Sequence, residues 1–366
     1  MTDPRVQKLA KIMVHYSLEL QPGDRFRLSG SIASLPLLRE VYREAVRAGA
    51  EVSTRIEVED FASIFLQEAS DELLTTVPEL AKYELEYFNK TLHISASENI
   101  YTLSGVDPKR ITLRSRATRE LGKRNMERAA TGELRWCLTR FPTQGHAMAA
   151  GMALSEYEEF VYGAGKLNEE DPIAAWKKVS QEQQRIVDYL NQHDVIHIEA
   201  PGTDLTYRVK GRTWISADGK VNFPDGEVFT GPIEDSVNGV VTFSYPAIYQ
   251  GNEVENVRLV FKDGKVIESS ADRGLDFLNT MLDMDEGSRF VGEVAIGTNY
   301  DIQRFTKDIL FDEKLGGTMH MALGQSYPDT GGKNESGLHW DMICDLRQGR
   351  ITADGELFYE NGKFLI

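Results

Sequence analysis

The sequence contains few cysteines and no long apolar run, and both absences exclude classes of protein. Only Cys137 and Cys344 occur in 366 residues, too few for a disulfide framework or a four-thiolate metal site. No stretch approaches the 18 apolar residues of a membrane-spanning helix. The amphipathic first 20 residues also lack the continuous apolar core of a signal peptide. We therefore expect a cytoplasmic protein without a membrane partner.

Basic residues are in the minority, which bears on the partners of the protein. The chain has 41 Lys and Arg against 57 Asp and Glu, a formal net charge of −16. Nucleic-acid binding needs basic surface, so we expect no nucleic-acid partner. No GxGxxG or GxxxxGK[ST] motif follows a predicted strand, so a nucleotide-binding fold has no motif support.

The first half of the chain alternates predicted strands with predicted helices. Short strands are expected at 25–29, 51–56 and 92–96, and helices at 34–49, 61–69 and 71–88. Strands separated by helices are typical of βαβ units and a mostly parallel sheet. We predict an α/β N-terminal domain over residues 1–190, since a chain of this length usually organises more than one core.

The pattern changes after residue 190. Runs rich in β-branched and aromatic residues at 195–199, 205–210, 239–245 and 257–261 predict short strands, and 275–282 predicts a single helix. Asp-Gly and Asn-Gly pairs favour tight hairpins between antiparallel strands; they occur at 218–219, 263–264, 354–355 and 361–362. Residues 191–366 are therefore predicted to form an α+β catalytic domain with a largely antiparallel sheet.

Polar residues stand singly within apolar strands of this second domain. His339 and Asp341 lie two apart in LHWDMI, so a strand would project both from one face. Alone, such a pair is more often structural than metal-binding. His320 in TMHMALG, Glu293 in FVGEVAIG and Glu227 in DGEVFT change this balance, because a buried carboxylate is costly unless it is paired or binds a metal. A salt-bridge network would need Lys or Arg in these strands, and they contain none.

The longer motifs in this half resemble the M29 family of metallo-aminopeptidases. The landmarks are PDGEVFTGP (224–232), GEVAIGTN (292–299), ILFDEK (309–314), HMALGQSYPDTGG (320–332) and HWD (339–341), in this order. The resemblance implies six metal ligands, with Glu293 bridging two ions, and an active-site tyrosine at Tyr327. The implied ligands are Glu227, Glu293, Glu313, His320, His339 and Asp341. It also implies a homodimer in which the N-terminal domain helps to enclose the active-site space.

The implied ligand set predicts the chemistry. Oxygen and nitrogen ligands without sulfur suit two divalent ions of zinc, cobalt or manganese. Two such ions would activate a hydroxide for attack on the first peptide bond of a peptide with a free N-terminus. Tyr327 would stabilise the oxyanion together with the ions. Either a non-ligating acid/base or Glu293 in a double role would move the proton to the leaving amine.

Alternatives remain at this point. Ring-cleaving dioxygenases that act on dihydroxypyridine are similar to this family, and His320, His339 and Asp341 alone would suit non-haem Fe(II). Engagement of Glu227 and Glu293 in a second metal site discriminates between the two enzymes. A non-enzymatic metal- or peptide-binding protein would keep the fold without turnover. The segment from Glu313 to His320 is longer than the family pattern, so Glu313 could instead be a surface partner of Lys314 or Lys307.

Overall fold

The protein divides into two compact units. The structure, a computed structural model, describes residues 3–366. The first unit comprises residues 1–173 and 219–224, and the second comprises 174–218 and 225–366. The boundary predicted at residue 190 differs, because most of α9 (Pro172–Leu190) belongs to the second unit. The reason is packing: Ile186, Val187 and Leu190 on this helix are part of the second unit's hydrophobic core.

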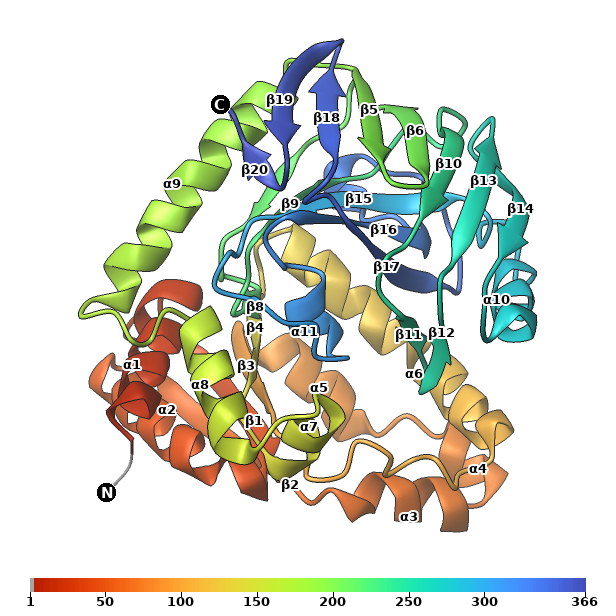
Figure 1. Ribbon diagram of the computed structural model, residues 1–366. Coiled ribbons are helices and arrows are strands. Elements are labelled where there is room, and N and C mark those ends of the chain that lie inside the picture. The colour runs from red at the N-terminus through yellow and green to blue at the C-terminus, as the bar shows by residue number, and fades with distance from the viewer. Residues whose placement is uncertain (1–2) are drawn as a thin grey trace. The chain divides into compact units, whose positions relative to one another are not determined.

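The first unit is built on a five-stranded sheet in which every pair of neighbouring strands is parallel, in the order β2-β1-β3-β4-β8 (Figure 1). This confirms the predicted α/β class with a mostly parallel sheet. The strands are β1 (Arg25–Ser31), β2 (Glu51–Glu57), β3 (Lys90–Ser95), β4 (Arg135–Arg140) and β8 (Asn222–Phe223). The helices are α1 (Pro4–Ile12), α2 (Leu35–Arg47), α3 (Asp60–Glu68), α4 (Asp71–Thr75), α5 (Glu79–Tyr87), α6 (Pro108–Ala130), α7 (Gln144–Ala149) and α8 (Leu154–Ala164).

The helix predicted over 71–88 is interrupted. It forms as α4 and α5, with residues 76–78 between them in extended or irregular conformation. Pro78 explains the break, because its ring removes a backbone donor and disfavours helical geometry at the residue before it.

The second unit contains two larger antiparallel sheets, which confirms the predicted antiparallel class although a single sheet was expected. The eight-stranded sheet has the order β14-β13-β10-β6-β5-β18-β19-β20, and the five-stranded sheet has the order β17-β16-β15-β9-β7. The strands of the larger sheet are β5 (Val195–Ala200), β6 (Thr203–Arg208), β10 (Asn238–Thr242), β13 (Arg258–Lys262), β14 (Lys265–Ser270), β18 (Arg350–Ala353), β19 (Glu356–Glu360) and β20 (Lys363–Phe364). Those of the smaller sheet are β7 (Ile215–Ala217), β9 (Glu227–Thr230), β15 (Val291–Gly297), β16 (Thr318–Gly324) and β17 (His339–Asp345).

The remaining elements of the second unit are short. A two-stranded hairpin is formed by β11 (Ala247–Tyr249) and β12 (Asn252–Val254). The two short helices are α10 (Leu275–Leu282), as predicted, and α11 (Ile309–Asp312).

Three of the four predicted turn pairs join antiparallel neighbours. The pairs at 263–264, 354–355 and 361–362 connect β13 to β14, β18 to β19 and β19 to β20, and both residues of each pair have positive φ, as a type I′ turn requires. Asp218-Gly219 does not make a hairpin. It lies where the chain passes from the second unit to the first, between strands of different sheets.

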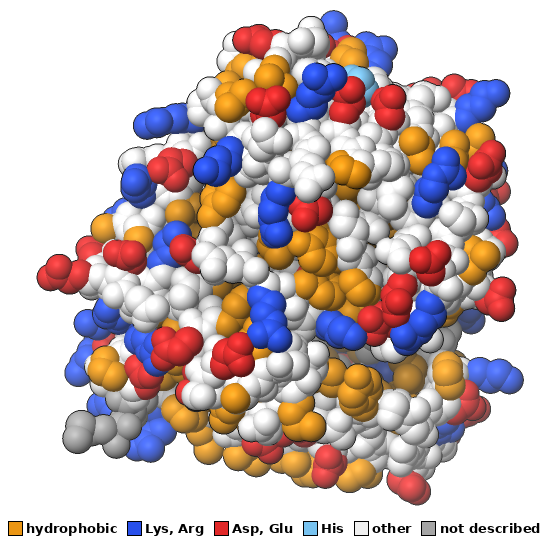
Figure 2. Space-filling view, in the orientation of Figure 1, with side chains coloured by type: hydrophobic (Ala, Val, Ile, Leu, Met, Phe, Trp, Pro, Cys, Tyr) orange, Lys and Arg blue, Asp and Glu red, His pale blue; other side chains and the backbone are white. Residues whose placement is uncertain are grey.

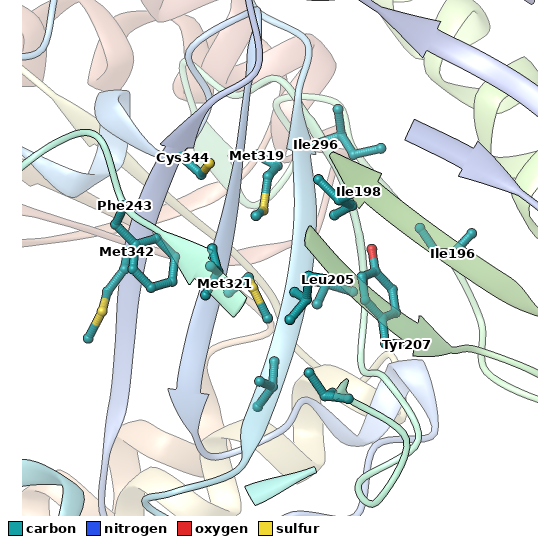
Figure 3. Packing of buried hydrophobic residues seen from close by; sticks show 14 of the residues in the cluster. Ile196, Ile198, Leu205, Tyr207, Phe243, Ile296, Met319, Met321, Met342 and Cys344 are labelled. Atoms are coloured by element: carbon teal, nitrogen blue, oxygen red, sulfur yellow. The ribbon is translucent and has the colours of Figure 1, made fainter. Parts of the chain in front are cut away.

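One face of the second unit's five-stranded sheet, β17-β16-β15-β9-β7, supplies much of that unit's core. On β15, β16 and β17 the apolar side chains alternate along each strand and point to the same face, which packs against residues of β5 and β6 (Figure 3). The core residues of this face are Val294, Ile296, Met319, Met321, Leu323, Trp340, Met342 and Cys344. Because strand residues alternate, the residues between them project from the other face.

Charged side chains of both signs are interspersed over the surface visible in Figure 2. Within residues 3–366, no helix combines the length and the apolar character needed to cross a membrane.

Truncation of Trp340 should destabilise the second unit. Its side chain is 1% exposed and its ring contacts those of Tyr249 and Phe277. Trp340→Ala should therefore cost about 3–5 kcal/mol in the free energy of unfolding, measured by urea denaturation. Ile267→Ala on exposed β14 is the control, and an equal loss in both variants would contradict the core assignment.

Candidate metal centre

Five of the predicted site residues lie on one face of the second unit's five-stranded sheet, β17-β16-β15-β9-β7. Glu227 begins β9, Glu293 lies in β15, His320 in β16, and His339 and Asp341 in β17. The register places Asp341 opposite Ala322, His339 opposite Gly324, and Glu227 opposite Gly297. Strand alternation therefore directs these side chains away from the apolar core face.

Small residues separate the polar ones. Ala295 and Gly297 follow Glu293 at two-residue intervals on β15, and Ala322 follows His320 on β16. A side chain at Gly297 would meet the backbone oxygen of Leu315 at 2.2 Å, so this position requires glycine. Short neighbours leave the longer glutamate and histidine side chains room to converge above the sheet.

Glu293 lies between the two histidines. Its Oε1 is 3.5 Å from His320 Nε2, and its Oε2 is 3.5 Å from His339 Nε2. The Glu293 side chain is 6% exposed. A carboxylate whose two oxygens face different imidazole nitrogens could bridge two cations.

The two remaining carboxylates flank this centre. Glu227 Oε2 lies 3.4 Å from His320 Nε2. Asp341 Oδ1 lies 3.6 Å from His339 Nε2 and 3.9 Å from His320 Nε2. Two three-residue sets with metal-ligand spacing result, and they share Glu293: one contains Glu227 and His320, the other His339 and Asp341.

Backbone carbonyls fix the orientation of both imidazoles. His320 Nδ1 lies 2.9 Å from the Glu313 carbonyl oxygen, and His339 Nδ1 lies 2.8 Å from that of Gln325. Each carbonyl accepts the Nδ1 proton, so Nε2 is the nitrogen that faces the carboxylates. An imidazole that loses its Nε2 proton could offer that nitrogen to a metal ion. This backbone support is the usual one for a metal-binding histidine.

Glu313 reaches the cluster in a different setting. Together with His320 and Asp341 it forms a third set with metal-ligand spacing. Its carboxylate also contacts the ammonium of Lys314. The surface interpretation of this pair does not describe the geometry, because the Glu313 side chain is 14% exposed and Lys314 is fully buried. Lys307 pairs with Glu253 instead.

Sequence reasoning missed Lys314 and Asp225. Lys314 Nζ lies 3.7 Å from Glu227 Oε1 and 3.9 Å from Asp225 Oδ1. Contrary to the expectation from the sequence, a basic residue need not lie within the strands to pair with their carboxylates, because Lys314 reaches Glu227 from the segment between α11 and β16. Their positions in the sequence could have indicated both residues, since Lys314 directly follows Glu313 and Asp225 lies two residues before Glu227.

Tyr327 lies at the edge of the cluster. Its ring is edge-on to the His339 ring, with centroids 5.1 Å apart, and it also contacts Phe229 at 5.8 Å. Partial burial and the charges of Glu293 and Asp341 raise the pKa of Tyr327 above its ordinary value. Its hydroxyl therefore stays protonated and can donate a hydrogen bond.

Burial and mutual charge shift the pKa values of the cluster. Burial raises the pKa of Asp225 to about 7, and it raises that of Glu227 well above the ordinary value although Lys314 opposes the shift. Burial lowers the pKa of His320, but the hydrogen bond to Glu293 and the nearby carboxylates outweigh it and raise the value to about 10. A divalent cation would displace the protons held in this way.

The cluster fits a divalent metal. Glu227 Oε2 is buried and has no hydrogen-bond partner, a costly state for a carboxylate oxygen that a cation would relieve. The converging donors are carboxylate oxygens and imidazole nitrogens, which suit borderline or hard divalent ions such as zinc, cobalt and manganese.

Comparison with known proteins agrees with this chemistry. A family model described as thermophilic metalloprotease (M29) matches residues 2–364. Aminopeptidase 2 of Geobacillus stearothermophilus is 30% identical over 97% of this chain and 95% of its own. Aminopeptidase T of Thermus thermophilus is 29% identical over 98% of this chain and 95% of its own.

Solved structures extend the likeness to the fold. AmpT of Thermus thermophilus superposes with a TM-score of 0.87 at 27% identity, covering 99% of both chains. The 2,5-dihydroxypyridine dioxygenase of Pseudomonas putida KT2440 has a TM-score of 0.61 at 14% identity, covering 98% of this chain and 96% of its own, a likeness of fold alone. With the family model matching nearly every residue, the chain belongs to the thermophilic metalloprotease (M29) family.

Proposed function

We propose that this protein is a metallo-aminopeptidase that removes the N-terminal residue from unblocked peptides. The site would hold two divalent ions of zinc, cobalt or manganese on Glu227, Glu293, Glu313, His320, His339 and Asp341. The relatives named aminopeptidases match this chain over almost its entire length. The proposal also includes a cytoplasmic location and a homodimer.

The position of Glu293 between His320 and His339 is the observation that carries the proposal. The summed charge of the cluster also supports two divalent ions. When all are ionised, as they would be beside bound cations, the carboxylates of Asp225, Glu227, Glu293, Glu313 and Asp341 carry five negative charges, and the Lys314 ammonium neutralises one of them. Four charges remain when both imidazoles are neutral, and two divalent cations would neutralise them.

The residues of the chain would then divide the reaction among themselves. Divalent ions held by these residues would supply a water of near-neutral pKa and polarise the scissile carbonyl. Glu293 accepts a proton from the attacking water and returns it to the leaving amine, so the proton count balances. Tyr327 donates its hydroxyl proton in a hydrogen bond to the developing oxyanion.

The dioxygenase alternative has less support. His320, His339 and Asp341 do lie together, as a mononuclear iron site would require. However, Glu293 lies between the two histidines and Glu227 contacts one of them. These carboxylates complete a second set of ligands that a single-ion site would not need.

Recognition of a free α-amine predicts strict dependence on an unblocked N-terminus. After loading with zinc, cobalt or manganese, the protein should hydrolyse free dipeptides and leave their N-acetylated forms intact. Prior chelation should abolish the turnover, and restored metal should recover it. Release of free amino acid measures the rate, and equal cleavage of acetylated and free substrates would rule out an aminopeptidase.

Glu293→Gln should separate the metal site from the fold. Glutamine keeps the shape but removes the charge shared by two ion positions, so the variant should lose at least one ion and its peptide hydrolysis. The metal-free protein should change by less than about 1 kcal/mol, or about 2–4 °C in Tm. The groups paired with Glu293 are His320 and His339, which can each release a proton. The substitution therefore leaves no fixed positive charge without a partner.

Elemental analysis and thermal melts of metal-free protein measure the two effects of Glu293→Gln. Glu268→Gln on exposed β14 is the matched control. A large loss of metal-free stability with unchanged ion content would instead make Glu293 part of a structural ion pair.

Tyr327→Phe tests the oxyanion role. Loss of one such donor lowers kcat by about a hundredfold or more, while the ion content should stay the same. Tyr83→Phe, an exposed tyrosine of α5, should leave kcat unchanged. A kcat near wild type in Tyr327→Phe would leave the ring a packing role beside His339 and exclude the hydroxyl from catalysis.

A further inference from the structure

Lys314 is a cation built into the candidate metal centre. Its side chain has 0% exposure, and its ammonium contacts the carboxylates of Asp225, Glu227 and Glu313. Burial of a lysine is costly unless its charge is compensated. When all three carboxylates are ionised, their negative charge exceeds the positive charge of one ammonium, and the excess is available to other cations.

The two carboxylate oxygens of Glu227 face different groups, the lysine and the candidate metal position. Its Oε1 faces Lys314 Nζ at 3.7 Å, and its Oε2 faces His320 Nε2 at 3.4 Å. The second oxygen is buried without a hydrogen-bond partner. The same carboxylate therefore compensates an ammonium on one side and offers an unshared oxygen to a metal ion on the other.

The two candidate ion positions differ in whether one of their carboxylates is paired with Lys314. The set of Glu227, Glu293 and His320 includes a carboxylate already paired with Lys314. In the described part of the chain, the ion pairs of Glu293, His339 and Asp341 are with histidines or carboxylates of the cluster and with no lysine or arginine. A positive charge close to one position and farther from the other makes their affinities unequal.

We propose that Lys314 is a positioning residue that serves as the internal counter-ion of this centre. It holds Glu227 and Glu313 against their mutual repulsion when the ion beside them is absent, and it lowers the affinity of that ion when it binds. The position at Glu227 is then the weaker, exchangeable one, and the position at His339 and Asp341 is the tighter one. This inference rests on the proposed binding of two divalent ions.

Lys314→Met tests the inference, because methionine fills similar volume without charge. Metal-free protein is titrated with Zn²⁺ or Mn²⁺ by calorimetry, and melting is followed with and without ions. The weaker ion should bind at least about tenfold more tightly in the variant, since a nearby positive charge has been removed. The metal-free Tm should fall, and the rise in Tm on adding ions should exceed that of wild type.

Two further variants separate charge from packing. Lys314→Arg keeps the positive charge and should retain two unequal ion affinities. Lys307→Met removes an exposed lysine that pairs with Glu253 and should change neither ion affinity. A purely structural lysine would instead lower the metal-free and metal-loaded Tm equally and leave both affinities alone.

The outcomes distinguish this inference from the function on which it rests. Wild-type protein that binds no divalent ion overturns the proposed function. Wild-type protein that binds two ions, with the weaker affinity unchanged or reduced in Lys314→Met, overturns only the counter-ion role. Failure of Lys314→Met to fold even with ions present also overturns it, because a tighter-bound ion should replace the missing charge.

Discussion

Repulsion among buried carboxylates is the constraint on which the second unit's chemistry depends. Glu227, Glu293 and Asp341 converge on one face of a sheet together with Glu313 and Asp225. Uncompensated charges at such burial are expensive. The cluster persists because one ammonium, two imidazoles and exchangeable protons or cations share the compensation. Cations bound at such a site would relieve the repulsion, which would couple metal binding to stability.

The second unit's five-stranded sheet carries its apolar core residues on one face and the clustered carboxylates and histidines on the other. One face of β15, β16 and β17 packs into the hydrophobic core, and the other carries the proposed ligands. Every ligand on these strands is therefore anchored by apolar neighbours one residue away, such as Val294 beside Glu293 and Trp340 beside His339. Rigid elements hold reactive groups more accurately than loops do, and the two backbone carbonyls that orient the imidazoles add to this order.

Much of this arrangement could be predicted because strand alternation is a local rule. It put His339 and Asp341 on one face and made Glu293 and His320 conspicuous in apolar runs, and the architecture of both sheets followed from composition and spacing. Family resemblance added Glu313 and Tyr327, which periodicity alone does not indicate. The parallel and antiparallel classes of the two units were both confirmed.

The failures came where distant segments meet. The position of Lys314 depends on the path of the chain between α11 and β16, and no local pattern shows that its ammonium reaches Glu227. The compact units divide at residue 173 and not at 190, because apolar residues of α9 pack into the second unit. Asp218-Gly219 has the composition of a hairpin turn, yet it connects strands of different sheets, which is a property of topology rather than of the dipeptide.

Anomalous scattering from a crystal of the metal-loaded protein tests the central claim most directly. The account predicts two closely spaced ions, one beside His320 and Glu227 and the other beside His339 and Asp341, with Glu293 contacting both. A single ion held by His320, His339 and Asp341, with Glu227 and Glu293 unengaged, would contradict it.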